Sequence, residues 1–323
     1  MKDRIFVIDG SSYLYRAYHA MPPLSTSSGQ PTGAVKGVTN MLMNLKKDSE
    51  GSSIIVVFDA KGKTFRSDIY SEYKANRPPM PDELRDQLLP VKSICRAIGF
   101  PLIEIDGVEA DDVIATIAKM AKDANYKCVI SSLDKDLMQL VEDPHTTLMD
   151  TMKHKIFNEE GVFEKFGVKP NQIRDMLALV GDTSDNIPGV PKVGQKTAAK
   201  WLAEYGDLKT IKQNAESIKG VVGDNLRNSL DDLDRNVELV SLKNDVDIGF
   251  KFQDLLAFNP NDEELDNLFA DLEFKAVDRN QEKEVPQKDS NYETVLDNKS
   301  LKSWISKINK SNAFAIDTET DSV

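Results

Sequence analysis

Short apolar runs alternate with helical patterns along the first half of the chain. Five runs are rich in Val, Ile and Leu and have the length of buried strands; they lie at residues 4–9, 53–59, 101–105, 127–132 and 146–150. Between them, segments such as 83–98 and 111–122 place apolar residues at helical spacing. This alternation predicts an α/β fold, with a central, mostly parallel sheet flanked by helices. In such sheets, ligands bind at the carboxyl ends of the strands.

The pattern changes from about residue 158, where strand-like runs largely stop. Residues 171–180 and 195–206 have apolar side chains at helical spacing, and Gly181 is placed to end the first of these helices. Residues 261–274 form one more amphipathic pattern. This part of the chain is therefore predicted to be mainly helical.

A polar segment separates the helical part from a last piece of chain. Residues 276–291 carry charges without apolar periodicity, so we interpret them as a linker. Beyond them, LKSWISKI has the pattern of a helix and AFAIDTET that of a strand. Because a strand that has just begun cannot complete a domain, we interpret residues 292–323 as the truncated start of a further domain.

The composition is that of an ordinary globular protein. Of 323 residues, 40% are hydrophobic and 29% are charged. The start has no signal-peptide architecture, and no apolar run approaches the roughly 18 residues that a membrane span needs. Cys95 and Cys128 each lie in an apolar run, which favours buried free thiols in a reducing cytosol over a disulfide or a zinc site. We therefore expect a cytoplasmic protein with no membrane partner.

The net charge of −12 argues against a nucleic-acid partner, since DNA is itself a polyanion, but it hides two basic islands. The first, residues 61–77, interleaves bases with aromatics, as base stacking and phosphate pairing require. At helical spacing, one face of it would carry Arg66, Tyr70, Tyr73, Lys74 and Arg77. The proline-rich residues 78–82 then predict a mobile loop over the strand ends. For any single residue, a solvated loop explains this island as well as contact with nucleic acid.

The second basic island lies between two predicted helices. No acid occurs between Asp185 and Glu204, whereas three lysines do. Gly189 and Gly194 nearly match the spacing of a phosphate-binding P-loop, but Gln195 stands where that motif needs lysine, and no strand precedes it. A helix–hairpin–helix that offers backbone N–H groups to a DNA phosphate fits the helical context better. An ordinary interhelical turn with solvated lysines is the plainer alternative.

Acidic residues gather at one topological position of the predicted fold. Most follow a predicted strand, and the last two follow the helix that ends at Gly181, so all could meet at one edge of the sheet. They are Asp9, Asp59, Glu109, Asp111, Asp112, Asp134, Asp136, Asp182 and Asp185. The equally acidic segments 231–234 and 261–267 lie on polar faces of amphipathic helices, and we assign them no chemistry.

Carboxylates crowded in this way need counter-charges. Two of them about 4 Å apart repel by about 4 kcal/mol at an effective dielectric constant near 20. Oxygen ligands without His or Cys favour Mg²⁺ or Mn²⁺, and nine acids exceed what one Mg²⁺ uses, so two ions are predicted. Two such ions are a known arrangement for phosphodiester hydrolysis. Helix capping by Asp explains any one position about as well, but it needs a separate reason for each of five segments.

The acids that follow the third predicted strand differ in direction. Glu109 and Asp112 are one helical turn apart and are expected to face one side together. Asp111 is expected to point elsewhere, so its place around a metal is the one that most needs a test.

Five long motifs resemble those of the 5′-nuclease domain of bacterial DNA polymerase I, which belongs to the flap endonuclease family. In order along the chain they are IDGSSYLYRAYHA, FDAKGKTFRSDIYSEYKANRPPMP, GVEADDVIATIA, SSLDKDLMQLV and GDTSDNIPGVPKVGQKTA. The resemblance covers most of residues 1–275. The tail from Asn291 resembles the start of the 3′–5′ exonuclease domain of the same polymerases, where Asp317 and Glu319 match a metal-binding Asp-x-Glu motif.

Together with the patterns above, the resemblance implies a PIN-like 5′-nuclease fold and a division of the chain. The expected parts are an α/β catalytic core with a helical arch, a helical DNA-binding region with a helix–hairpin–helix, a linker and a truncated exonuclease domain. They span residues 1–170 (arch around 61–90), 171–275 (helix–hairpin–helix at 182–203), 276–291 and 292–323.

The resemblance also implies roles for single residues. A first metal would be held or surrounded by Asp9, Asp59, Glu109, Asp111 and Asp112. A second metal would be held by Asp134, Asp136, Asp182 and Asp185. Lys74 and Arg77, the expected catalytic cations, would grip the scissile phosphate from the arch together with Arg66 and Tyr73. Duplex DNA, with K⁺ at the hairpin, would be contacted by Gly189, Val190, Gly194, Lys196 and Thr197.

The implied activity is that of a Mg²⁺-dependent 5′–3′ exonuclease and flap endonuclease, for which Mn²⁺ can substitute. A metal-bound hydroxide would attack the phosphorus in line. The expected partners of this monomer are duplex DNA with a 5′ flap or nick and RNA primers paired with DNA, in replication and repair at the bacterial nucleoid. Without the remaining proofreading motifs and a polymerase region, this chain is expected neither to proofread nor to synthesise DNA.

Two other functions stay open at this point. A non-catalytic module that binds DNA structures would keep its function when Asp111 or Asp182 is replaced by asparagine, whereas a nuclease would lose rate and keep binding. An acid-site RNA nuclease on the same sheet would cleave RNA without needing duplex DNA.

Overall fold

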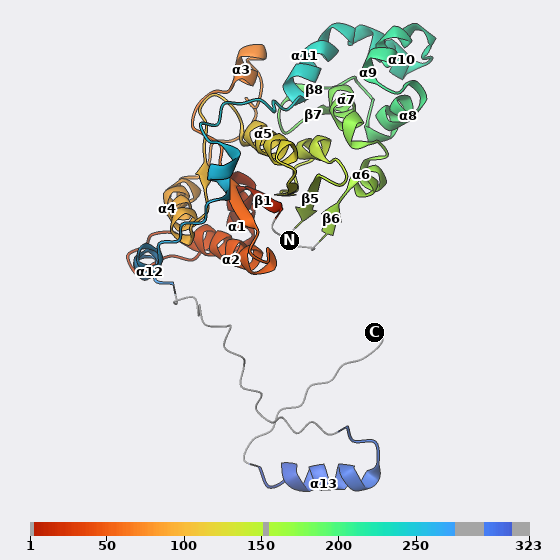
Figure 1. The fold of residues 1–323 in the computed structure, drawn as a ribbon. Helices are drawn as coiled ribbons and strands as arrows, with labels where there is room; N and C mark the ends of the chain where they lie inside the picture. Colours follow the sequence, from red (N-terminus) through yellow and green to blue (C-terminus); the bar gives the residue numbers. More distant parts are fainter. Residues whose placement is uncertain (1–2, 151–154, 275–293, 312–323) are drawn as a thin grey trace. The chain divides into compact units, whose positions relative to one another are not determined.

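The computed structural model describes residues 3–150, 155–274 and 294–311. The chain divides into two units, residues 1–276 and 277–323. The first unit is built on a six-stranded sheet with the strand order β3-β2-β1-β4-β5-β6 (Figure 1). The strands are β1 (Arg4–Asp9), β2 (Ser53–Val57), β3 (Leu102–Ile103), β4 (Lys127–Ser131), β5 (Thr146–Asp150) and β6 (Lys155–Phe157).

The sheet confirms the predicted α/β class. Strands β1 to β5 run parallel, and β6 pairs antiparallel at the edge. Each of the five predicted strands is present, although β3 keeps only two of its five predicted residues. The carboxyl ends of the parallel strands therefore meet at one edge of the sheet, where the acids were expected.

Helices cover both faces of this sheet. On one face, α5 (Ala110–Asp123) packs against β1 and β4, and Ile5 and Val7 join its side chains in the main core. Because side chains alternate along a strand, the intervening Phe6 and Ile8 point to the other face. On that face lie α1 (Gly10–Ala20), α2 (Gly33–Asp48) and α4 (Asp82–Ile98).

The second half of the first unit is mainly helical, as predicted. It contains the α-helices α6 (Glu159–Phe166), α7 (Pro170–Val180), α8 (Gln195–Tyr205), α9 (Leu208–Gln213), α10 (Val221–Asn228), α11 (Leu230–Val240) and α12 (Asp262–Asp271). Short 3₁₀ helices lie at η1 (Asp136–Leu140), η2 (Ala215–Ser217) and η3 (Phe252–Leu256). The acidic segments within α11 and α12 are on amphipathic helices, as expected, with Leu233 and Leu265 turned to the interior.

A short hairpin joins α7 to α8. It consists of β7 (Gly181–Asp182) and β8 (Ile187–Pro188), and Gly181, which ends α7 as predicted, has a φ of +75°. A Cβ atom on Gly189 would lie 2.0 Å from the carbonyl oxygen of Val180, so this close approach requires glycine. The hairpin loop carries Asp182 and Asp185.

The segment predicted as a helical arch around residues 61–90 is only partly helical. A five-residue helix, α3 (Phe65–Ile69), is followed by turns over residues 71–76, and α4 begins at Asp82. The expected single helical face of bases and aromatics is therefore wrong. Lys74 has a φ of +56°, a left-handed conformation that a continuing helix would not contain.

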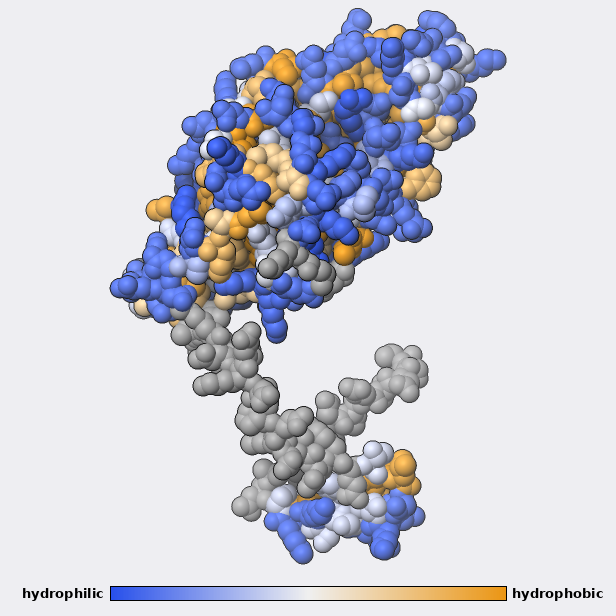
Figure 2. Space-filling view, viewed as in Figure 1, coloured by the Kyte–Doolittle hydropathy of each residue, from blue (hydrophilic) through white to orange (hydrophobic). Residues whose placement is uncertain are grey.

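The second unit shows one described element, the predicted helix α13 (Asn298–Ile308). The predicted linker and the predicted strand with Asp317 and Glu319 lie outside the described residues. In the described part of the chain, no helix has the length and apolar character that crossing a membrane requires. On the face of the first unit in Figure 2, hydrophilic side chains predominate and apolar ones form separate smaller areas.

Candidate active site

Asp9 connects the end of β1 to the start of α1. Its carboxylate accepts hydrogen bonds from the backbone N of Ser12 at 2.8 Å, as a helix N-cap, and from Ser132 Oγ at 3.0 Å. Capping thus accounts for one of its oxygens, as the plainer reading of the sequence expected. Burial nevertheless raises the pKa of Asp9 to about 7, and the negative charges of Asp59 and Asp134 add to this shift.

Asp111 lies among the same acids on the first turn of α5. Burial raises its pKa well above the usual value, and the charges of Asp134, Asp9 and Asp59 raise it further. Asp59 lies at the start of this helix too, accepting from the backbone N of Ala110 at 2.9 Å. We call Asp9, Asp59, Asp111 and Asp134 the sheet-edge acids. Among the described residues, none of these four forms an ion pair within 4.0 Å.

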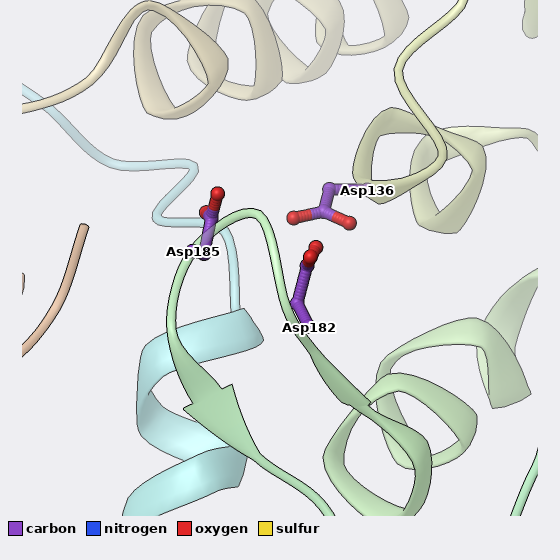
Figure 3. A group of neighbouring side chains, drawn as sticks. All are labelled: Asp136, Asp182 and Asp185. Carbon is purple, nitrogen blue, oxygen red and sulfur yellow. The ribbon is translucent and has the colours of Figure 1, made fainter. Parts of the chain in front are cut away.

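A second group of acids meets where the hairpin loop approaches η1. Oxygen atoms of Asp136, Asp182 and Asp185 lie within 4.8 Å of one another, and we call these residues the three-Asp cluster. Figure 3 shows Asp182 on one arm of the hairpin, Asp136 across from it and Asp185 on the other arm. Asp136 Oδ1 is buried without a hydrogen-bond partner. Burial, with the charges of Asp134 and Asp182, raises the pKa of Asp136 to about 8.

Asp182 is held on both sides by protein donors. One oxygen accepts from the backbone N and Oγ of Ser184 at 2.8 and 2.6 Å, and the other lies 2.9 Å from Lys135 Nζ. Burial acts to raise the pKa of Asp182, but these bonds from Ser184 and Lys135 outweigh it and hold the pKa below its usual value. Sequence reasoning missed Lys135, although its place between two predicted ligands in SLDKD was a usable signal.

The predicted catalytic cations lie against these acids. Lys74 Nζ is 2.7 Å from Glu109 Oε1 and 3.7 Å from Asp185 Oδ2, while Arg77 Nη2 is 2.5 Å from Asp185 Oδ1. Tyr73 shares its single hydroxyl hydrogen between Glu109, at 3.1 Å, and Asp185, at 3.0 Å, so it links the two carboxylates. Burial acts to lower the pKa of Lys74, but the charges of Glu109 and Asp185 outweigh it and raise the pKa.

Asp112 faces Arg66 rather than the sheet-edge acids. The guanidinium group donates to both carboxylate oxygens, at 2.6 and 2.9 Å, and neither side chain is more than 2% exposed. Asp112 also accepts from the backbone N of Lys243, and Arg66 donates to the carbonyl oxygens of Leu239 and Ser241. The predicted metal ligand and the predicted DNA contact therefore do not fit this arrangement, because each side chain satisfies the other inside the protein.

The direction predicted for the first turn of α5 is confirmed. Glu109 Oε2 lies 3.5 Å from Arg66 Nη1, so Glu109 and Asp112 do face one side together. Asp111 instead lies among the sheet-edge acids. Tyr73, which was predicted to contact DNA, is only 7% exposed, and its hydroxyl is hydrogen-bonded to two carboxylates. Little of its surface is therefore accessible to a ligand.

The residues predicted to contact DNA at the hairpin are placed unequally. Lys196 is exposed and Thr197 half-buried on the first turn of α8, and Gly194 precedes that helix as its N-cap, with open space beside it. Val190 is buried, and its backbone N donates to Leu179 O at 2.8 Å. The N–H of Val190 is therefore not available to a phosphate, which corrects the expectation for this residue.

The donor set can be tested for its fit to the predicted metals. It contains carboxylate oxygens alone, as hard divalent cations prefer, and one of these oxygens is buried without a partner. Burial and neighbouring carboxylates raise the pKa values of Asp9, Asp111 and Asp136, and a cation bound beside them would offset both effects. The residues present therefore fit divalent cations.

Comparison with known proteins matches two family models to this chain. The model described as 5'-3' exonuclease, N-terminal resolvase-like domain, covers residues 4–167, and that described as 5'-3' exonuclease, C-terminal SAM fold, covers residues 168–264. A 5'-3' exonuclease of Aquifex aeolicus is 41% identical over 273 residues, which cover 84% of this chain and 93% of that protein. A DNA polymerase I of Pseudomonas aeruginosa is 44% identical over 339 residues and covers 99% of this chain.

This chain spans 37% of the length of the Pseudomonas polymerase. Among solved structures, a zinc-bound 5'-exonuclease of phage T5 is similar with a TM-score of 0.65 at 25% identity, covering 83% of this chain and 98% of the phage protein. A variant flap endonuclease of phage T5, solved in a complex with DNA and metal ions, is similar too, with a TM-score of 0.65 at 24% identity and coverage of 84% of this chain and 99% of that one.

Proposed function

Because the chain belongs to the 5′–3′ exonuclease family, we propose that it is a structure-specific nuclease that removes 5′ flaps and RNA primers from duplex DNA by two-metal catalysis. The observation that carries this proposal is the row of acids at the carboxyl edge of the sheet, which continues into the three-Asp cluster. Over its described length the chain would form the 5′-nuclease part of a DNA polymerase I and work in the bacterial cytoplasm.

We assign the two ions to different groups of acids. Asp9, Asp59 and Asp111 would hold one Mg²⁺, the three-Asp cluster would hold the other, and Asp134 would lie between them because its charge acts on both groups. When bound, such ions supply positive charge to phosphate oxygens and activate water at neutral pH. The carboxylates fix the ions, and no side-chain nucleophile is required.

Lys74 and Arg77 would bind and orient the scissile phosphate. Both cations already lie beside the acids, at Glu109 and Asp185, so a phosphate that reaches the site meets them there. Their charges would stabilise the transition state by electrostatic attraction. Tyr73 would keep Glu109 and Asp185 in place through its two hydrogen bonds.

Duplex DNA would lie against the helix–hairpin–helix. The exposed Lys196, the half-buried Thr197 and the open N-terminus of α8 at Gly194 offer positive charge and backbone N–H groups to a phosphate. The K⁺ ion expected at this hairpin remains a prediction from family resemblance. Binding to a flap in EDTA, measured at several salt concentrations, should weaken steeply as salt is added.

The nuclease activity is tested with a duplex that carries a labelled 5′ flap. Product is expected with Mg²⁺ and not with EDTA. Equal product under both conditions would overturn the metal mechanism. Cleavage of single-stranded RNA without any need for duplex DNA would instead favour an acid-site RNA nuclease.

A further inference from the structure

Two loops beside the acids are joined by hydrogen bonds and ion pairs. The first, residues 70–77, carries Lys74 and Arg77. The second, residues 182–187, is the hairpin loop that carries Asp185. The ion pairs of Lys74 and Arg77 with Asp185 described above cross between these loops, but they involve long side chains that other placements could also satisfy.

Two asparagine side chains fix the loops more specifically. Asn76 Nδ2 donates to the carbonyl oxygen of Thr183 at 2.7 Å, and Asn186 Nδ2 donates to the carbonyl oxygen of Glu72 at 2.7 Å. Each loop thus contributes one amide side chain and receives one on its backbone. Because the two bonds run in opposite directions and join different residues of the loops, the pair sets the register of one loop against the other.

Backbone contacts complete the arrangement. The backbone N of Lys74 donates to the carbonyl oxygen of Asp185 at 2.9 Å, and Arg77 Nε donates to that of Ser184 at 3.2 Å. Lys74 and Asn186 are both left-handed, with φ values of +56° and +57°. Asparagine adopts this conformation readily, but lysine does so at a cost, so the contacts around Lys74 have to hold it there.

We propose that Asn76 and Asn186 are positioning residues of the nuclease, which hold the 70–77 loop on the hairpin so that Lys74 and Arg77 reach the scissile phosphate together. This inference rests on the proposed function, because it concerns the cations assigned to that reaction. The side-chain amide of each asparagine donates to a backbone carbonyl oxygen of the opposite loop. Their contribution is to the fraction of molecules in which the loop is docked.

Hydrogen exchange measures this docking without any substrate. The Lys74 amide is expected to exchange about five- to tenfold faster in the Asn76→Ala and Asn186→Gly variants, as the loss of about one hydrogen bond predicts. Asn186→Gly keeps a residue that tolerates the left-handed backbone, so it removes the amide alone. Asn76→Asp replaces the N–H donor with a charged acceptor opposite the carbonyl oxygen of Thr183, so its exchange should be at least as fast as that of Asn76→Ala.

Kinetics on a flap duplex with Mg²⁺ then connects docking to function. The kcat of each single variant is expected to fall by about threefold or more, with little change in KM, and the double variant should fall further. Asn125→Gly is the matched control, since Asn125 is also left-handed and lies exposed at the end of α5. It should leave both the exchange of Lys74 and the kcat unchanged.

Three results would overturn the proposal: unchanged exchange of Lys74 in both single variants, faster exchange throughout the unit, or faster local exchange with wild-type kcat. Failure of the proposed function looks different. In that case the unmodified chain would not cleave the flap duplex, while the exchange measurement would still report whether the asparagines dock the loop.

Discussion

Two neighbouring regions at the start of α5 each contain an aspartate, but the two carboxylates have opposite surroundings. At the sheet edge, Asp111 is surrounded by other acids, and its pKa is raised by burial and by their charges. In the pocket around Arg66, the adjacent Asp112 is fully buried, and a guanidinium group donates to both of its oxygens. Burial of a carboxylate is therefore not by itself a sign of function. A buried acid without a basic partner requires charge from outside the protein, whereas a paired one supports the fold.

The largest effect is expected from breaking the sheet edge. Asp111→Asn removes one of the acids assigned to the metals and should lower kcat on a 5′-flap duplex with Mg²⁺ by about 10²–10³-fold or more, because metal stabilisation of the transition state is weakened. Binding of the flap duplex in EDTA should remain. Asp231→Asn on the exposed face of α11 is the matched control and should cleave normally. A loss of activity of less than threefold in Asp111→Asn would remove Asp111 from the site.

Breaking the paired region should affect stability instead. Asp112→Asn leaves the buried guanidinium of Arg66 without its counter-charge and should lower the free energy of unfolding by about 3–5 kcal/mol. Urea denaturation in EDTA measures this change. Under the same conditions Asp111→Asn should stabilise the protein, because it removes a half-buried carboxylate that is crowded by Asp134, Asp9 and Asp59. Equal destabilisation by both substitutions would abolish the contrast between the two regions.

The pH dependence of stability sharpens the contrast further. Asp9 and Asp136 have pKa values of about 7 and 8 in the folded protein, above the ordinary value of 3.8. Between the unfolded and folded pKa values, the folded state therefore binds more protons than the unfolded state. The free energy of unfolding in EDTA should fall as the pH rises from about 5 to 8. The expected loss is on the order of several kcal/mol, which saturating Mg²⁺ should largely reverse.

Thermal denaturation at several pH values, with EDTA and with Mg²⁺, measures this linkage. Asp9→Asn should flatten the slope in EDTA while keeping the N-cap of α1, since asparagine caps a helix as well as aspartate does. If stability in EDTA stays constant or increases as the pH rises, Asp9 and Asp136 do not need positive charge from a bound cation.

The smallest expected effect concerns the three-Asp cluster, which includes an acid that is paired with a lysine. In the three-Asp cluster, Lys135 already places one positive charge on Asp182. Lys135→Met should therefore tighten the binding of Mn²⁺ to the DNA-free chain by about three- to tenfold, since it removes a competing cation. Isothermal titration calorimetry measures the affinity. Lys122→Met, which removes an exposed lysine paired with Glu142, is the control; weaker Mn²⁺ binding in Lys135→Met alone would contradict the expectation.

The architecture of the first unit was largely readable from the sequence. Buried parallel strands are continuous Val- and Ile-rich runs, so the strands stood out between amphipathic helices, and Gly181 marked the end of α7. The conformation of the arch could not be predicted from the sequence in the same way. Bases and aromatics at helical spacing suggested a helix beyond Ile69, but tertiary contacts with the hairpin hold Lys74 in a left-handed turn.

The acids could be predicted as a set more easily than one by one. Their positions after strands located the site, because parallel strands end together. The separate role of Asp112 depends on Arg66, which is 46 residues away in the sequence, and no local pattern reports that contact. Asn76 and Asn186 were missed for the same reason, since their partners lie on a distant loop.

A crystal structure with Mn²⁺, located by its anomalous scattering, tests the contrast between the two regions most directly. Two ions are expected, one bound by acids that include Asp111 and one by the three-Asp cluster, while Asp112 keeps both hydrogen bonds to Arg66. A Mn²⁺ ion bound to Asp112, with Asp111 turned away from both ions, would contradict the division of the acids on which the proposed mechanism depends.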